Sequence, residues 1–330
     1  MRGPRPSRLV TAAAALVLAV AVSACDAGGA GGTGVTDDPD ASDGPDAVDW
    51  PSAGEPLAVD GLVWAADGTV HLPDGTRVVV GDATRETGDY VVAGGGVWFR
   101  GYRTPADVPA GAEDLGPADA LHVADATGRA TEVGIGVDSL AASPDGRYVA
   151  LIDLTSGPED RYGTPLAEVV VVEAATGAEV LRSADGMGDP RSDDLAALYP
   201  DAEIEVLGFA DGRVWVETAE GLRTFDPATG DSAEGERDAV PAGAPWLEVG
   251  GAAPPGVDPE RWRALSRLSD GTLVGVVPDP GTAGGVLTTC AVPAGPCAPV
   301  EGSAGRVVRL PAGTAADEVV DLAEVGAPVG

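Results

Sequence analysis

The chain has 330 residues, and its 53 acidic residues against 20 basic ones give a formal net charge of -33 at pH 7. Every basic residue is arginine, and lysine, asparagine and glutamine do not occur in the sequence. This composition excludes mechanisms that need a lysine, such as a P-loop or a Schiff base, and it argues against a nucleic-acid partner. A hydrophobic content of 44% with 48 glycines and 28 prolines is typical of a folded chain that turns often.

The first residues have the pattern of an export signal. Arg2, Arg5 and Arg8 precede an uncharged apolar run from Leu9 to Val22. This run is shorter than the roughly 20 residues of a membrane-spanning helix, but it has the length of the apolar region of a signal peptide. The sequence therefore predicts a signal peptide over residues 1–24.

The segment Val22-Ser23-Ala24-Cys25 resembles the lipobox of bacterial lipoproteins, in which an aliphatic residue and two small residues precede a cysteine. The resemblance implies cleavage before Cys25 and attachment of a diacylglyceryl group to its thiol, usually with acylation of the new amino terminus. Two or three acyl chains hold a protein stably on a membrane. We therefore expect a protein anchored by lipid to the extracytoplasmic face of the cell membrane. The alternative is an ordinary secretory signal with a cysteine placed by chance.

Residues 25–49 are rich in glycine, aspartate, alanine and proline and contain no aromatic residue. Seven aspartates and no basic residue make this segment self-repelling. Such a segment cannot bury enough apolar surface to offset the entropy cost of ordering. The sequence therefore predicts a disordered acidic tether between the lipidated cysteine and a folded domain over residues 50–330.

Short apolar runs separated by turn residues fill the predicted domain. Asp-Gly pairs divide apolar runs at 67–68, 145–146, 211–212 and 270–271, and such pairs favour hairpins with primed turns. A second phrase, an apolar run followed by an acidic residue and an Ala-Thr-Gly turn, ends at Gly128, Gly177 and Gly230. Four-stranded units that repeat every 40 to 50 residues are typical of a β-propeller.

Ser143-Pro144-Asp145-Gly146-Arg147-Tyr148-Val149-Ala150 is similar to the blade motif of TolB-type and WD-repeat-like β-propellers, and the Ala-Thr-Gly phrases are similar to turns of quinoprotein-type propellers. The resemblance covers roughly residues 55 to 310 and implies an all-β domain. We expect five to seven four-stranded blades, and a β-sandwich or two smaller β domains are the alternatives. Of two unassigned stretches, 235–263 and 303–325, one is expected to complete the first blade. Five blades are recognisable, near 60–81, 90–131, 137–182, 202–234 and 264–300.

The remaining cysteines and the histidines offer few catalytic possibilities. In an oxidising compartment, with Cys25 lipidated, Cys290 and Cys297 are the only free thiols, so a disulfide is the leading interpretation. A redox pair or a metal site is less favoured, because the spacing is not Cys-x-x-Cys and both histidines are distant. His71 and His122 each lie in an alternating apolar strand and are interpreted as structural.

Four tryptophans have contexts that suggest different roles. Trp98 and Trp215 lie in strand runs and are predicted to pack between blades. Trp246 and Trp262 lie in the irregular stretch 235–263 and are the candidates for an exposed binding surface.

The function expected from the sequence is a binding or interaction module rather than an enzyme, with no cofactor. Its partners would be membrane lipid, through acylated Cys25, and an envelope protein, peptide or glycan. The alternative is an extracytoplasmic hydrolase or lyase that uses carboxylates in the propeller channel, where acids with raised pKa should then converge in a closed pocket. A quinone-cofactor enzyme is disfavoured by the lack of asparagine, a usual metal ligand in that family.

Overall fold

The structure is a computed structural model. The predicted signal peptide, Cys25 and the tether up to residue 47 lie outside the part that it describes. Lipidation and the tether therefore stay predictions. The described residues are 48–52, 54–81, 88–101, 119–241, 244, 246–247, 253–279, 281, 284–292, 295–315 and 319–325.

The described part of the chain is all-β, with 20 strands and one α-helix, α1 (Leu195–Ala202). All strand pairs in its sheets are antiparallel, and the strands form four sheets of five, seven, four and four strands. The helix begins at Asp194, whose side chain accepts a hydrogen bond from the N–H of Ala197 and so caps it.

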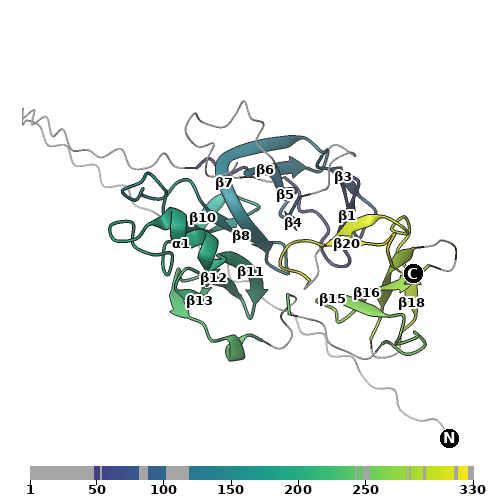
Figure 1. The fold of residues 1–330 in the computed structure, drawn as a ribbon. Coiled ribbons are helices and arrows are strands. Elements are labelled where there is room, and N and C mark those ends of the chain that lie inside the picture. Colours follow the sequence, from purple (N-terminus) through teal and green to yellow (C-terminus); the bar gives the residue numbers. More distant parts are fainter. Residues whose placement is uncertain are drawn as a thin grey trace, which may run out of the picture. The chain divides into compact units, whose positions relative to one another are not determined.

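The first sheet joins the beginning of the described chain to its end. It has the order β20-β19-β1-β2-β3, so the last two strands extend the sheet of the first three (Figure 1). This confirms that one of the two unassigned stretches completes the first blade, and it identifies that stretch as residues 303–325. The stretch 235–263, in its described residues, holds a 3-10 helix (Arg237–Ala239) and reaches a strand only at Arg263. The strands are β1 (Trp64–Ala66), β2 (Thr69–His71), β3 (Arg77–Val79), β19 (Val307–Arg309) and β20 (Val319–Asp321).

The seven-stranded sheet is two four-stranded units that share one long strand, β7 (Ala130–Ala142). Residues of β7 up to Gly136 pair with β6, and residues from Val137 onward pair with β8. Both pairings contain a register irregularity, which allows the strand to pass from one unit into the next. The other strands are β4 (Tyr90–Ala93), β5 (Gly96–Gly101), β6 (Ala120–Asp125), β8 (Tyr148–Asp153), β9 (Glu168–Glu173) and β10 (Ala178–Ser183).

Two further four-stranded sheets follow in chain order, β11 to β14 and β15 to β18. The described residues therefore form five antiparallel units in succession, the topology of a β-propeller and within the predicted range of blades. Their strands are β11 (Glu205–Ala210), β12 (Arg213–Thr218), β13 (Gly221–Phe225), β14 (Ser232–Glu234), β15 (Arg263–Arg267), β16 (Leu273–Pro278), β17 (Gly285–Cys290) and β18 (Cys297–Pro299).

The turn phrases occupy corresponding places in successive units. The three Ala-Thr-Gly turns each join the third strand of a unit to the fourth. At 67–68 and 211–212 both turn residues have positive φ, as a primed turn requires. At 145–146 and 270–271 only the glycine does, with φ of 66° and 87°, so the expectation of primed turns was wrong at these two hairpins. The Asp145 carboxylate there accepts hydrogen bonds from Ser143 and Arg147, which holds an alternative turn.

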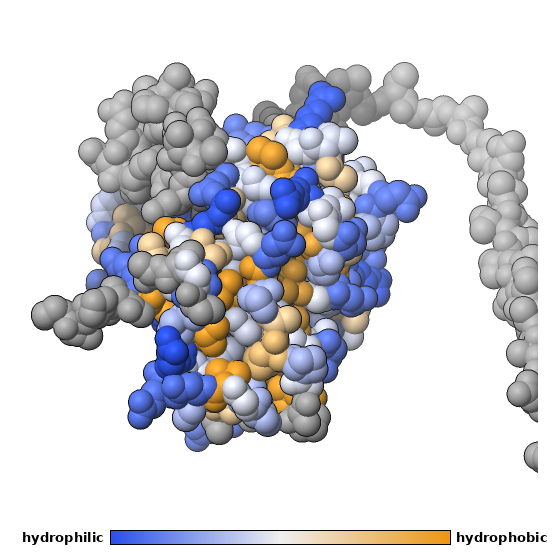
Figure 2. Space-filling model, turned by 90° about the vertical axis from the view of Figure 1, so that its right-hand side faces the viewer, coloured by the Kyte–Doolittle hydropathy of each residue, from blue (hydrophilic) through white to orange (hydrophobic). Residues whose placement is uncertain are grey.

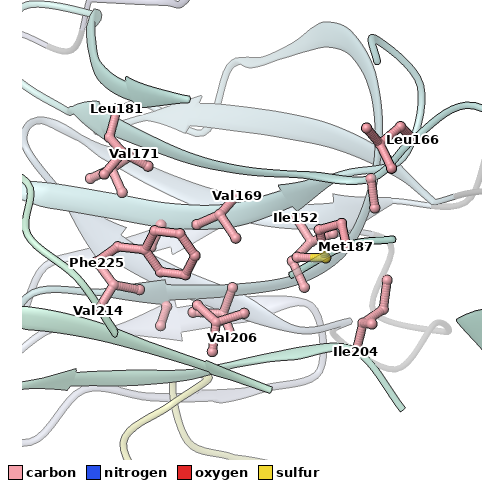
Figure 3. Packing of buried hydrophobic residues seen from close by; sticks show 14 of the residues in the cluster. Ile152, Leu166, Val169, Val171, Leu181, Met187, Ile204, Val206, Val214 and Phe225 are labelled. Carbon is pink, nitrogen blue, oxygen red and sulfur yellow. The ribbon is translucent and has the colours of Figure 1, made fainter. Parts of the chain in front are cut away.

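Among the described residues, four pairs of units bury apolar faces on each other, because an isolated four-stranded sheet cannot cover both faces. Figure 3 shows the cluster between the β7–β10 and β11–β14 units, where Ile152 and Val169 meet Val206 and Phe225. Corresponding clusters lie between the β4–β7 and β7–β10 units, between the first sheet and the β4–β7 unit, and between the first sheet and the β15–β18 unit. This serial packing differs from a β-sandwich, in which two sheets share one core.

Candidate binding pocket

A pocket of about 130 Å³ lies where the five units come together. Its walls are mostly aliphatic, and most of the strand residues that line it belong to the first strand of their unit. Each unit contributes at least one residue, among them Val63, Val92, Ala142, Phe209 and Ser266. A site of this kind needs the whole domain to be folded before it exists.

One side of the pocket is formed by the segment 311–314, which connects β19 to β20. The backbone N–H of Ala312 donates to the carbonyl oxygen of Tyr90 at 2.9 Å, and the Ser266 hydroxyl donates to the carbonyl oxygen of Thr314. The segment is thereby fixed to both the β4–β7 and the β15–β18 units. These hydrogen bonds fix the segment as one wall of the pocket.

Besides that of Ser266, two further hydroxyl groups in the lining are already used inside the protein. The Ser143 hydroxyl donates to Asp145 at 2.6 Å and accepts from the N–H of Tyr148 at 2.9 Å. The Thr314 hydroxyl donates to the carbonyl oxygen of Pro311. Neither group is free to recognise a ligand.

Arg267, at the end of β15, is the charged residue of the lining. It is exposed, and its guanidinium forms no ion pair within the described part of the chain. Ser269 also lines the pocket, and the described lining contains no aspartate or glutamate. Within the described residues, the pocket is thus an apolar hollow lined by one arginine without an ion pair, in a protein whose net charge is -33.

A separate group of charged residues surrounds Arg100 on β5. The Arg100 guanidinium donates to Asp89 at 2.7 Å and to Asp119 at 2.9 Å, and Arg309 also donates to Asp89. None of these residues lines the pocket. These ion pairs connect β5 and β19 to the residues that directly precede β4 and β6. We therefore interpret their role as structural.

Two acids beside this group hold their protons more tightly than usual. Burial raises the pKa of Asp138, and the charges of Asp89 and Asp119 raise it further, against the effect of Arg100. Partial loss of solvent raises the pKa of Glu205, and Asp138 adds to the effect, although the Glu205 side chain keeps contact with water. Neither lines the pocket, so the convergent acids that a pocket hydrolase requires do not lie there.

The raised pKa of Asp138 predicts a pH-dependent effect of substitution. An acid whose pKa is raised by folding adds stability below its unfolded-state pKa, near 3.8, and this stability is lost as the pH rises through the folded-state pKa. Asp138→Asn is therefore expected to raise the melting temperature at pH 8 and to change it little near pH 4.

Asp145 is the matched control, to be measured by thermal unfolding at both pH values. Burial tends to raise the pKa of Asp145, but hydrogen bonds from Ser143 and Arg147 outweigh it and lower the pKa. Asp145→Asn should therefore destabilise at pH 8. A fall in melting temperature at pH 8 for Asp138→Asn would contradict the prediction.

Both tryptophans predicted to form a binding surface are partly buried and lie outside the pocket lining. A Cβ placed on Gly208 would be 2.6 Å from the ring of Trp246, and one on Gly275 would be 2.4 Å from the ring of Trp262. Each ring therefore rests on a glycine of a neighbouring strand. Their role in binding stays a prediction.

Gly275→Ala is expected to cost about 2 to 3 kcal/mol, because the added methyl would meet the Trp262 ring and the Arg263 carbonyl oxygen, the latter at 2.6 Å. Gly54→Ala, where a Cβ meets nothing within 4 Å, is the control and should change stability by no more than about 0.5 kcal/mol. Urea unfolding of both variants measures the difference. Equal midpoints would show that the strand accommodates the methyl.

The predicted disulfide between Cys290 and Cys297 is confirmed. The two residues lie directly opposite each other on β17 and β18, and their sulfurs are bonded. The histidines are on strands: His71 stacks on Trp64 with ring centroids 4.0 Å apart, and His122 stacks on Phe99 at 5.4 Å. Neither histidine lines the pocket.

Sequence reasoning missed Arg267, although the repeats contain a signal for it. Arg267 precedes Leu268-Ser269-Asp270-Gly271 as Ala142 precedes Ser143-Pro144-Asp145-Gly146, and both residues line the pocket. A charged arginine at a repeat position where another blade has alanine indicates a role other than core packing. Alignment of the two turn sequences would therefore have marked Arg267 as a candidate binding residue.

The outer surface offers a less defined alternative. Figure 2 shows a face on which apolar side chains gather between hydrophilic ones. Among the described residues, the exposed large hydrophobic side chains include Val307 on β19 and Val319 on β20. No ligand chemistry follows from these side chains alone.

No protein-family model and no curated protein matches the chain. Among solved structures, a putative TolB from Agrobacterium tumefaciens has 11% identity, a TM-score of 0.29 and coverage of 76% of this chain and 80% of that chain. The β-propeller domain of the Trilobed protease from Pyrococcus furiosus has 11% identity, a TM-score of 0.26 and coverage of 74% and 71%. These superpositions are loose, and the β-propeller assignment rests on the sheet topology above.

Dipeptidyl peptidase 4 from Porphyromonas gingivalis is a third similar structure, with 11% identity and a TM-score of 0.28. The match covers 81% of this chain and 45% of that chain. Within the described residues, no helix has the length and apolar character needed to cross a membrane.

Proposed function

We propose that the chain is a lipid-anchored binding module, held outside the cytoplasm by acylated Cys25, that takes a small ligand or the end of a peptide into the pocket between its five units. The observation that carries this proposal is the pocket itself, to which every unit contributes and in which Arg267 has no ion pair with any described residue. The Cys290–Cys297 disulfide supports an oxidising location.

The size of the pocket supports a small ligand. Its 130 Å³ is well above the roughly 10 to 15 Å³ that one water needs, but below the roughly 300 to 1,000 Å³ of sites for drug-sized molecules. A short side chain or a small acid matches this range. A folded partner protein would have to present such a group as an anchor.

Filling the pocket tests the proposed binding. Ala142 lines the pocket and is partly buried beside the cluster between the β4–β7 and β7–β10 units, so Ala142→Leu should fill the hollow, and an unchanged melting temperature would show that the core is intact. Small apolar compounds, both neutral and anionic, are titrated against the full chain and followed by NMR. Saturable shifts that disappear in Ala142→Leu support the proposal, and identical shifts in both proteins would contradict it.

Membrane fractionation tests the anchor independently. Cys25→Ser removes the thiol that would carry the diacylglyceryl group, so the variant should leave the membrane fraction. The acidic chain has no electrostatic attraction to a negatively charged bilayer that could retain it. Continued membrane association of the variant would defeat the lipoprotein interpretation.

An extracytoplasmic hydrolase is the second candidate, and the raised pKa values of Asp138 and Glu205 are the observation in its favour. Hydrolysis of chromogenic glycosides or peptides, lost in both Asp138→Asn and Glu205→Gln while the fold is retained, would support it. The position of both acids outside the pocket lining favours the binding module.

A further inference from the structure

We propose that the pocket selects ligands carrying a carboxylate next to a short aliphatic group, with Arg267 as the partner of the carboxylate. This inference rests on the proposed function of the same pocket and specifies its ligand class.

Arg267 is distinguished by its place in the pocket lining rather than by its lack of an ion pair. Arg100 holds two carboxylates and Arg182 holds three, but other arginines, among them Arg129, Arg161 and Arg261, hold none within the described residues. Arg267 holds none within the described residues, yet it lines the pocket. A guanidinium presents paired N–H groups that match both oxygens of a carboxylate.

The surroundings of Arg267 keep its charge available. Asp270 is close in sequence, but its carboxylate already accepts from the N–H of Thr272 at 2.8 Å and from the Thr272 hydroxyl at 3.0 Å. The Ser269 hydroxyl lines the pocket and makes no hydrogen bond within the described residues, so it can donate to the same ligand. Two donors therefore lie at the pocket with no acid in its lining.

The remaining lining determines what accompanies the carboxylate. Leu62, Val63 and Leu310 form an aliphatic wall, which suits a short branched or linear carbon chain. A free ammonium group would find no aspartate or glutamate in the described lining, and burying it unpaired is costly. Free amino acids are thereby disfavoured, whereas short carboxylic acids and the carboxyl terminus of a peptide share the chemistry that fits.

The net charge of -33 does not prevent an anion from reaching this pocket. Interactions between exposed charges are largely screened beyond about 8 Å at physiological ionic strength. Among the described residues that line the pocket, the charged one is Arg267. A carboxylate that enters the pocket would therefore meet a positive charge in the lining itself.

Calorimetric titration of the full chain with three probes tests the inference. Isovalerate represents a free short acid, N-acetylleucine represents a peptide carboxyl terminus, and N-acetylleucinamide is the neutral control. We expect at least one carboxylate to bind saturably and the amide to bind at least tenfold more weakly, because a charge-assisted hydrogen bond is lost. Stronger binding of N-acetylleucine than of isovalerate assigns the peptide terminus, and the reverse order assigns the free acid.

Arg267→Met keeps the length of the side chain and should weaken carboxylate binding at least tenfold while leaving the amide unaffected. Arg261→Met is the matched control, because Arg261 is also exposed but lies outside the pocket lining. Arg267 is exposed, so its replacement should leave the melting temperature nearly unchanged, which confirms that the variant folds.

Three results would overturn the inference. Equal affinity for the amide and the carboxylates, or unchanged carboxylate binding in Arg267→Met, would exclude the guanidinium as selector, while sensitivity to Ala142→Leu would still support a binding pocket. A failure of all three probes to saturate at about 10 mM would overturn the carboxylate class. If neutral compounds also gave no pocket-dependent shifts, the proposed function would fall with it.

Discussion

Replacing Arg182 with methionine is expected to lower the free energy of unfolding by about 3 to 5 kcal/mol. The Arg182 guanidinium on β10 donates to Asp153 at 3.1 Å, to Glu168 at 2.6 Å and to Glu179 at 2.9 Å. Burial alone would lower the pKa of Arg182, but these three carboxylates raise it above its ordinary value. Without the cation, Asp153, whose side chain has 0% exposure, would be left as a buried charge.

Urea unfolding of Arg182→Met and Arg147→Met measures this cost against a matched control. Arg147 also pairs with a carboxylate of the β7–β10 unit, Glu173, but its side chain is 57% exposed, and such an exposed pair contributes little to stability. Adding Asp153→Asn to Arg182→Met should recover part of the loss. If Arg182→Met lowered the free energy of unfolding no more than Arg147→Met does, water would be screening the interaction between Arg182 and its three carboxylates, and the prediction would be wrong.

Replacing Trp98 with alanine is expected to cost about 3 to 5 kcal/mol. Trp98 on β5 has 0% exposure and belongs to the cluster that packs the β4–β7 unit against the β7–β10 unit. Its ring centroid lies 6.5 Å from that of Trp50, and its indole N–H donates to the carbonyl oxygen of Ala93 at 3.3 Å. Truncation would remove one of the two tryptophan side chains of this cluster and leave a cavity.

Trp246→Ala is the comparison, because Trp246 is only partly buried and packs on Gly208. It should lower the midpoint of chemical unfolding less than Trp98→Ala does, and Trp98→Phe should fall between the two. If Trp98→Ala proved the milder substitution, Trp98 would not be the packing residue that its burial indicates.

Much of the fold was predictable because its signals are local. Asp-Gly hairpins and Ala-Thr-Gly turns are set by backbone preferences over a few residues, and they locate strand boundaries wherever they occur. The predicted blade near 202–234 corresponds to strands over 205–234, and that near 264–300 to strands over 263–299. The burial of Trp98 and Trp215 followed from their positions in apolar strand runs, and both are buried.

Other features were not predictable because they depend on pairing between distant segments. The single strand Ala130–Ala142 serves two units, which a reading of separate blades near 90–131 and 137–182 did not anticipate. The turn at 145–146 departs from the primed type, because side-chain hydrogen bonds to Asp145 select another geometry.

The binding pocket illustrates the same limit of local information. Val63, Ala142 and Arg267 are far apart in the chain, and only the packing of all five units brings them to one hollow. The raised pKa of Asp138 likewise reflects burial and charges from two other segments. Neither property is encoded in the spacing of neighbouring residues.

By itself, the sequence determined the all-β class, the succession of four-stranded units and the pairing of Cys290 with Cys297, because short-range periodicity, turn chemistry and the small number of thiols carry that information. The tertiary structure decided that the last strands extend the first sheet, that Trp246 and Trp262 rest on glycines, and that Arg267 lines a pocket whose described lining contains no acid. These outcomes depend on which apolar surfaces, distant in sequence, are buried against each other. That burial is favourable only when the whole domain is folded, so local sequence does not reveal it.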